Sequence, residues 1–164
     1  KGATREQALK AVEIAKKVGI PFGAFFMTGL PGDSYERFLD TYKLAKESGF
    51  EEVRFYNVIP FPETELYRML KEKNALLREP EDYLNTSSKF QNDPLYELEG
   101  FRIEEKKRAL ELGQGIMMKK LLEKEFGKTF GGIAFRAWQN KFLRRYIKKP
   151  GIKLWALIRK SKRR

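Results

Sequence analysis

The sequence predicts an α/β fold in which two parallel strands with flanking helices are followed by an α-helical extension. Three observations support this class. Helical and strand patterns alternate through the first 76 residues, with short connections between them. A nearly continuous apolar run, residues 20–28, has the composition of a buried strand. The patterns from residue 103 onward are helical.

A helical pattern opens the chain. Thr4 is placed to cap this helix, and Gln7, three residues later, completes a capping box. Apolar residues recur at helical spacing until Gly19, a residue type that favours helix ends. Residues 20–28 then form the first strand, and their composition predicts that it is buried on both faces.

The second strand follows one helix later. Residues 29–32 break the first strand, and Asp33 or Ser34 caps a helix that continues to about residue 48. Residues 53–59 form the second strand, and a further helix covers about residues 62–73. This order is a βαβ unit, which requires parallel neighbouring strands. Because two strands make a poor sheet, we expect the sheet to continue beyond this segment.

The chain divides into three predicted parts. Residues 1–76 carry the strands, and residues 77–100 form a linker or irregular cap, because prolines and short polar runs interrupt any periodicity there. Residues 101–164 form a helical extension with a basic tail.

The extension contains two predicted helices, at residues 103–126 and 132–148. Gly113 and Gly115 lie inside the first one, where each costs about 1 kcal/mol relative to alanine. This cost favours close packing of another element at these glycines.

Composition excludes several kinds of chemistry. The 164 residues include no cysteine and no histidine, so the chain has no disulfide, thiolate metal site, cysteine nucleophile or imidazole base. No apolar run approaches the roughly 20 residues that cross a bilayer, and no signal-peptide pattern opens the chain. We expect a cytoplasmic location, with peripheral association at the membrane as an extension of it.

Positive charge is concentrated in the last part of the sequence. Eleven lysines and arginines and no acidic residue follow from Asn140 onward, whereas the remaining residues carry 23 basic and 22 acidic groups. This asymmetry predicts an anionic partner for the tail. Basic residues beside Trp155 and Ile158 favour an anionic membrane surface over nucleic acid. A solvated tail without a partner remains the third interpretation.

Two turns are candidates for ligand contact because parallel strands present ligand-binding groups at their carboxyl ends. Residues 29–33 follow the first strand, and their glycines would let backbone approach a ligand. After the second strand, backbone groups near Val58 and Ile59 could meet a flat heterocycle. The alternative for both segments is a rigid turn that binds nothing.

Arg54 and Tyr56 share strand parity with Val58. If Val58 points into a barrel lumen, the other two side chains are lumen-facing as well. A solvent-facing Arg54 is the alternative. The acidic residues form no catalytic pair, so the sequence indicates no catalytic residue in this chain.

Three segments carry a resemblance to a known family. Residues 15–20 (AKKVGI), 25–33 (FFMTGLPGD) and 60–67 (PFPETELY) resemble the radical S-adenosylmethionine superfamily, in particular the branch with an N-terminal cobalamin-binding domain. The resemblance covers about residues 1–74. It implies that the two strands belong to the C-terminal part of a partial (β/α)6, TIM-like barrel.

The resemblance also implies cofactors and site residues. In the full-length protein, S-adenosylmethionine and a [4Fe-4S] cluster would generate a 5′-deoxyadenosyl radical, in an enzyme of oxidoreductase or methyltransferase type, with cobalamin as a further cofactor of the branch. Met27 falls where a strand packs against the adenine, and Gly29 at the close-approach glycine. Val58 and Ile59 fall at the adenine edge.

Three departures from the family pattern stand out. Asp33 replaces the usual glutamate, and Glu63 replaces a glycine, which predicts a different turn there. The cysteine loop that holds the cluster is absent. We therefore expect this chain to be an inactive C-terminal piece of a radical enzyme that binds no cofactor alone. The expected partner is the rest of its own barrel, with self-association as an alternative.

Overall fold

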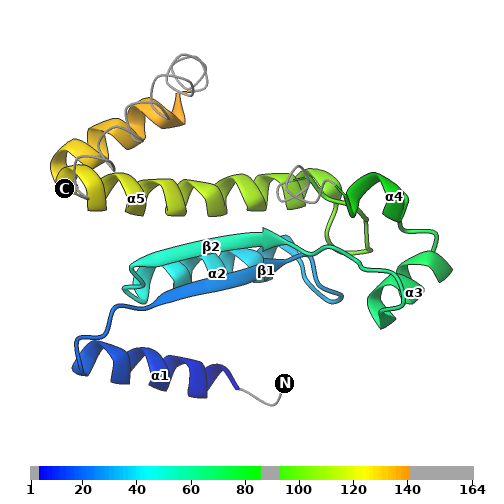
Figure 1. Cartoon of the computed structure of the whole chain (residues 1–164), viewed down its shortest axis with the longest axis horizontal. Helices are drawn as coiled ribbons and strands as arrows, with labels where there is room; N and C mark the ends of the chain where they lie inside the picture. Colours follow the sequence, from blue (N-terminus) through cyan, green and yellow to red (C-terminus); the bar gives the residue numbers. More distant parts are fainter. Residues whose placement is uncertain (1–3, 86–92, 141–164) are drawn as a thin grey trace. The chain divides into compact units, whose positions relative to one another are not determined.

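The computed structural model describes residues 4–85 and 93–140 (Figure 1). It shows a mixed α/β chain with a two-stranded sheet and a long final helix. Two compact units are present, unit 1 (residues 1–117) and unit 2 (residues 118–164). The elements are α1 (Arg5–Lys17), β1 (Gly23–Thr28), α2 (Tyr35–Glu47), β2 (Glu52–Asn57), α3 (Glu65–Glu72), α4 (Pro80–Tyr83) and α5 (Ile103–Gln139).

The strands β1 and β2 are parallel neighbours, as the sequence predicts. Their register pairs Gly23 with Glu52 at one end and Thr28 with Asn57 at the other. Figure 1 shows both arrows pointing the same way, and α2 connects them. This confirms the βαβ order. The described residues do not show the further strands of a barrel.

Side-chain caps fix where the first helices begin. Thr4 and Gln7 form the predicted capping box, with hydrogen bonds of 3.2 and 2.9 Å in opposite directions. Ser34 caps α2 by accepting from the Arg37 amide at 3.2 Å. Thr64 caps α3 in the same way, so that helix begins later than the predicted residue 62. Ser34 rather than Asp33 is therefore the cap, which leaves Asp33 available to the preceding turn.

The main core lies on one face of the sheet. Phe26 and Phe55 stack there with ring centroids 5.0 Å apart. Residues of two helices belong to the same cluster, namely Phe38 and Ala45 of α2 and Ala109 and Ile116 of α5. On the opposite face Phe25 and Met27 remain 67% and 64% exposed. The prediction of a first strand buried on both faces is therefore wrong, because no described part of the chain covers the second face.

Gly113 lets α5 approach the sheet closely. A Cβ atom at this position would lie 2.6 Å from the Phe55 Cβ. Real side chains do not approach that closely, so only glycine fits between α5 and β2. The close packing predicted at Gly113 is confirmed.

A second hydrophobic cluster involves the segment predicted as a linker or irregular cap. Leu95 and Tyr96 pack there with Leu70 of α3 and Tyr83 of α4. The Tyr83 hydroxyl donates to the Pro60 carbonyl at 2.5 Å, and burial raises its pKa to about 12. The described residues of this segment therefore cover the turn that follows β2.

Unit 2 contains the second half of α5. Gly127 has φ 77° and ψ 165°, so the helix is two helical stretches joined at this residue. A Cβ atom at Gly131 would lie 2.6 Å from the Leu122 carbonyl oxygen, so the stretches meet backbone to backbone. The predicted helix start at residue 132 is wrong, because the second stretch follows directly after Gly127. The predicted continuation to residue 148 and the basic tail lie outside the described residues.

Among the described helices, none combines the length and the apolar character that crossing a membrane requires.

Candidate functional site

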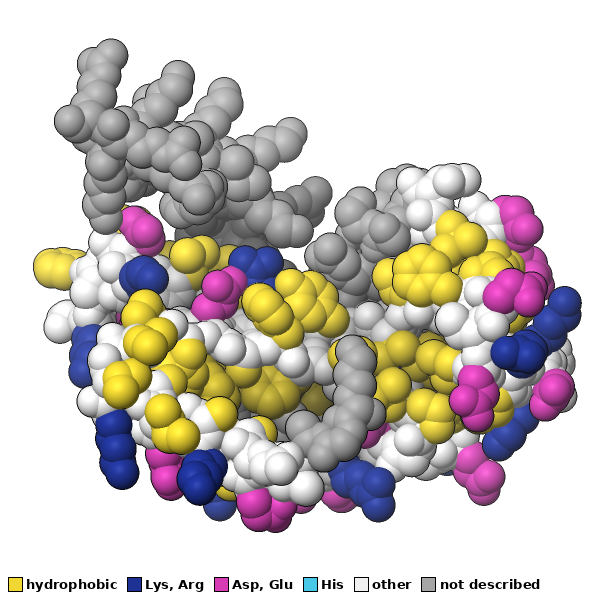
Figure 2. All heavy atoms as spheres, turned by 60° about the horizontal axis from the view of Figure 1, so that its bottom comes forward, with side chains coloured by type: hydrophobic (Ala, Val, Ile, Leu, Met, Phe, Trp, Pro, Cys, Tyr) yellow, Lys and Arg dark blue, Asp and Glu magenta, His cyan; other side chains and the backbone are white. Residues whose placement is uncertain are grey.

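The uncovered face of the sheet carries the first candidate surface. Phe25 and Met27 alternate along β1 and pair with Arg54 and Tyr56 of β2 in the strand register. The Phe25 and Tyr56 rings meet edge to face, with centroids 5.9 Å apart. Figure 2, with the α1 side of Figure 1 turned forward, shows hydrophobic side chains gathered on that side of the molecule. An exposed apolar surface of this kind is typical of a binding surface.

Arg54 has its polar partners on its own strand. Its Nε donates to Glu52 at 2.5 Å, and Nη1 lies 3.4 Å from the Tyr56 hydroxyl. Hydrogen bonds to Tyr56 and then to Glu52 raise the pKa of the guanidinium. The Arg54 side chain is 47% exposed. The structure therefore places Arg54 and Tyr56 on the uncovered face together with Met27.

The turn at residues 29–33 is closed by its own aspartate. The Asp33 Oδ2 accepts hydrogen bonds from the Gly29 and Leu30 amides, at 2.8 and 3.1 Å. The Asp33 amide in turn donates to the Leu30 carbonyl at 2.9 Å. Gly29 has φ 100°, a conformation that glycine adopts without strain. Because Asp33 accepts from these two amides, they are not free to bind a ligand. A ligand could contact this turn only through its surface.

Two side chains from distant parts of the chain complete this turn. The Tyr96 hydroxyl donates to the Gly29 carbonyl at 2.6 Å. Lys106 of α5 is only 1% exposed, and its Nζ donates to the Tyr96 carbonyl at 3.1 Å. The Lys106 Nζ also lies 4.0 Å from the centroid of the Tyr96 ring. The Lys106 stem packs tightly against the place where a Gly29 Cβ would stand, with its Cε 3.3 Å from that position.

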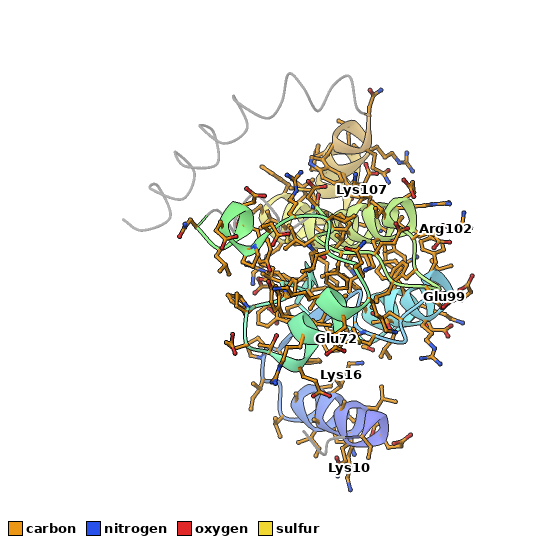
Figure 3. The ribbon with its side chains drawn as sticks, turned by 90° about the vertical axis from the view of Figure 1, so that its right-hand side faces the viewer. Lys10, Lys16, Glu72, Glu99, Arg102 and Lys107 are labelled. Carbon is orange, nitrogen blue, oxygen red and sulfur yellow. The ribbon has the colours of Figure 1, made fainter. Side chains whose placement is uncertain are left out.

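Burial shifts the pKa values of both residues. Desolvation lowers the pKa of Lys106 from the usual 10.5 to about 8, against the attraction of Glu97 and Asp33. Desolvation also raises the pKa of Tyr96, and the Asp33 charge adds to that effect. Arg102 and Lys107, labelled in Figure 3, lie near the start of α5 and are exposed, unlike Lys106.

Sequence reasoning missed Lys106 and Tyr96, although one signal was present. Lys106 occupies a stripe that recurs at helical spacing through Ala109, Leu110, Gly113 and Ile116, all of them buried. A lysine on an apolar stripe indicates a buried ammonium group with dedicated partners.

The other predicted contact residues lie close to this turn. The Val58 amide donates to the Thr28 carbonyl over a long 3.4 Å, while the Val58 side chain is buried in the second cluster. Ile59 packs against the same cluster. The Thr28 hydroxyl is buried without a hydrogen-bond partner in the described residues. The structure thus brings Gly29 and Val58 to one end of the sheet, with Met27 on its uncovered face.

Metal ligands are not grouped in the described residues, which contain no cluster of three or more aspartate, glutamate, cysteine or histidine side chains. The sequence supplies no cysteine. The residues of this chain therefore do not fit a [4Fe-4S] cluster, which is held by thiolates.

Comparisons with known proteins show a similarity to a methyltransferase over part of the chain. No family model matches the chain. Over 110 residues, 67% of its length, the chain is 30% identical to an uncharacterized methyltransferase of Pyrococcus horikoshii. That stretch makes up 23% of the relative, so the chain spans about a quarter of its length. The chain is therefore similar to a methyltransferase over part of its sequence.

Proposed function

We propose that residues 1–76 form part of the S-adenosylmethionine site of a radical S-adenosylmethionine enzyme of methyltransferase type. The uncovered face of the sheet carries this proposal. Met27 and Tyr56 lie side by side there, next to the glycine turn at the carboxyl end of β1. The partial similarity to a methyltransferase supports the choice of reaction over an oxidoreductase.

The residues suit a nucleoside better than a charged ligand. Met27, Phe25 and Tyr56 present apolar and aromatic surface to a flat ring. The turn amides are held by Asp33, so they are not available to an anion. When bound, S-adenosylmethionine supplies the radical or methyl chemistry, while these residues orient its adenosine and exclude water. An iron-sulfur cluster would need thiolates from outside this chain, and cobalamin a domain outside it.

The uncovered face would line the interior of the barrel, because the remaining strands of the same barrel would extend this sheet from its edges and close it around the proposed nucleoside site. A strand face with two large apolar side chains more than 60% exposed is rarely left open in a finished domain. The methyltransferase relative is about four times as long as the matched stretch, which leaves ample chain to supply those strands. A second copy of this chain is the competing occupant, and it would show as a dimer in sedimentation analysis.

A titration of the chain with millimolar S-adenosylmethionine, followed by nuclear magnetic resonance, tests the proposed site. Because this chain supplies only part of the proposed site, stable cofactor binding is not expected of it, and weak contacts should appear at millimolar concentration as shifts at the Met27 methyl group and at the Val58 and Ile59 amides. Met27→Ala should weaken the shifts of the Val58 and Ile59 amides, whereas Leu39→Ala, which removes an exposed apolar side chain from α2, should not. Equal shifts with adenosine-free methionine, or shifts that ignore Met27→Ala, would contradict the proposal.

A second candidate function rests on unit 2. Its residues include 16 lysines and arginines but two acidic residues. Phe130 and Ile133 are 72% and 59% exposed, and Phe126 on the other side of the Gly127 break is 42% exposed. Apolar side chains exposed on a helix, next to a strongly basic stretch of sequence, favour binding to an anionic lipid surface. We propose that unit 2 attaches the protein peripherally to such a surface.

Vesicle sedimentation with the whole chain tests the lipid proposal. Binding to phosphatidylserine-containing vesicles should exceed binding to neutral ones, and it should weaken with salt because the attraction decays over a Debye length of about 8 Å. Phe130→Ser should reduce binding at unchanged charge, while Leu39→Ser on unit 1 should not. Equal binding to both vesicle types, or a preference for nucleic acid with a steep salt dependence, would reject it.

A further inference from the structure

The turn at residues 29–33 is held at both backbone polar groups of one residue, Gly29. The Gly29 amide is bound by the Asp33 carboxylate at 2.8 Å. The Gly29 carbonyl is bound by the Tyr96 hydroxyl at 2.6 Å, across 67 residues of sequence. A turn clamped in this way has one backbone conformation only as long as both of its partners stay in place.

Lys106 contacts Tyr96, the partner that is more distant in sequence from the turn. Its ammonium donates to the Tyr96 carbonyl and lies over the Tyr96 ring, so it contacts this residue twice. Its stem packs tightly against the place where a Gly29 Cβ would stand. A charged donor strengthens the hydrogen bond, and the ring face attracts the cation. The charge also attracts Asp33, the other partner of Gly29.

We propose that Lys106 is the positioning residue of the 29–33 turn, and that loss of its proton loosens the turn. A neutral amine can still donate to the Tyr96 carbonyl. It loses the charge-assisted part of that bond, the attraction to the ring and the attraction to Asp33. The proposal extends the proposed function, since this turn borders the nucleoside site suggested above.

The groups around Lys106 are consistent with this role. Asp33 faces it from the turn, and Glu97 and the Tyr96 phenol face it from the segment that precedes α5. Two nearby charged residues, Arg102 just before α5 and Lys107 on it, are exposed to solvent (Figure 3). Proton loss at Lys106 therefore removes the positive charge that lies between Asp33, Glu97 and Tyr96.

The test follows the Gly29 and Leu30 amide resonances of the whole chain from about pH 6 to about pH 9.5, the range in which Lys106 titrates. In the unmodified protein both resonances should shift in one transition that shares its midpoint with the Cε signal of the buried lysine. Lys106→Met should abolish the transition, and Lys106→Arg should keep the low-pH positions throughout. Lys107→Met, the exposed neighbour, should change nothing.

Different outcomes decide the two proposals separately. Amide shifts that persist in Lys106→Met, or that miss the lysine midpoint in the unmodified protein, would overturn the role of Lys106. This second comparison needs no variant, so it decides even if a variant does not fold. Adding millimolar S-adenosylmethionine at both pH extremes tests the site itself. If the turn follows Lys106 but the nucleoside shifts nothing, the proposed function fails and the role of Lys106 stands.

Discussion

The two units of this chain differ in the balance of their basic and acidic residues and in the burial of charged side chains. Unit 1 contains 18 basic and 20 acidic residues, and it buries Lys106 among groups that compensate it. Unit 2 contains 16 basic and two acidic residues, and in its described part Phe130 and Ile133 are exposed. The charge of Lys106 is thus part of the fold of unit 1, whereas the excess positive charge of unit 2 is the basis of the proposed lipid binding.

This difference predicts which conditions each unit responds to. Buried charge responds to pH, because the protein rather than the solvent sets its pKa. Exposed charge responds to salt, because ions screen it within about 8 Å at physiological ionic strength. Unit 1 should therefore change its stability with pH, and unit 2 its binding with salt.

The largest expected effect is at the contact between α5 and the sheet in unit 1. Gly113→Ala would place a Cβ 2.6 Å from the Phe55 side chain. Overpacking of this kind costs about 1–3 kcal/mol, more than the roughly 1 kcal/mol that alanine gains over glycine in a helix. Urea denaturation followed by circular dichroism should show a lower free energy of unfolding. A gain in stability would contradict the close contact.

Unit 2 offers a matched pair of glycines for the same question. Gly131→Ala would place a Cβ 2.6 Å from the Leu122 carbonyl oxygen, whereas nothing lies within 4 Å of a Cβ at Gly132. We expect Gly131→Ala to speed hydrogen exchange across residues 118–140, and Gly132→Ala to slow it through helix propensity. Neither should alter exchange in β1 and β2. Equal effects of the two substitutions would contradict the backbone contact at Gly131.

The next effect concerns the link between Tyr96 and the glycine turn. Tyr96→Phe removes the hydroxyl that donates to the buried Gly29 carbonyl. An unsatisfied buried acceptor costs about 1–3 kcal/mol, so the free energy of unfolding should fall by that amount. Tyr67→Phe is a suitable control, since Tyr67 is only half-buried. Equal losses in both variants would show that the 2.6 Å hydrogen bond does not contribute to the free energy of unfolding beyond what any tyrosine hydroxyl does.

A smaller effect is a dependence of stability on pH. The unfolded Lys106 keeps its proton up to its usual pKa of 10.5, and the folded one only up to about 8. Between these values the unfolded state binds more protons, so the free energy of unfolding rises with pH by at most about 1.4 kcal/mol per unit. The desolvation cost that proton loss relieves exceeds the attraction to Glu97 and Asp33 that it removes, so the whole fold gains stability even though the 29–33 turn loses contacts. The slope should be measured below about pH 9.5, before the tyrosines titrate in the unfolded chain. It should vanish in Lys106→Met and persist in Lys107→Met.

Local patterns in the sequence carried much of the fold. The Thr4 capping box, the parallel strands and the packing role of Gly113 all depend on a few neighbouring residues or a clear period, and all are confirmed. The uncovered face of β1 was not predictable, because an apolar run does not reveal whether its second face has a partner in the same chain. The clamp on Gly29 joins residues 67 apart in sequence, a distance that periodicity does not reach.

The smallest expected effect concerns the turn before α3, where Glu63 replaces the glycine of the family pattern. Glu63 has φ 67°, so the chain keeps a left-handed conformation that glycine adopts without strain. A side chain costs about 1–2 kcal/mol in this region, while glycine adds about 0.4–1 kcal/mol of freedom to the unfolded chain. Glu63→Gly should therefore stabilise unit 1 by roughly 0.5–1 kcal/mol, measured by thermal denaturation. Glu63→Ala retains the Cβ and should gain nothing, so equal stability of the glycine and alanine variants would show that this turn is not strained.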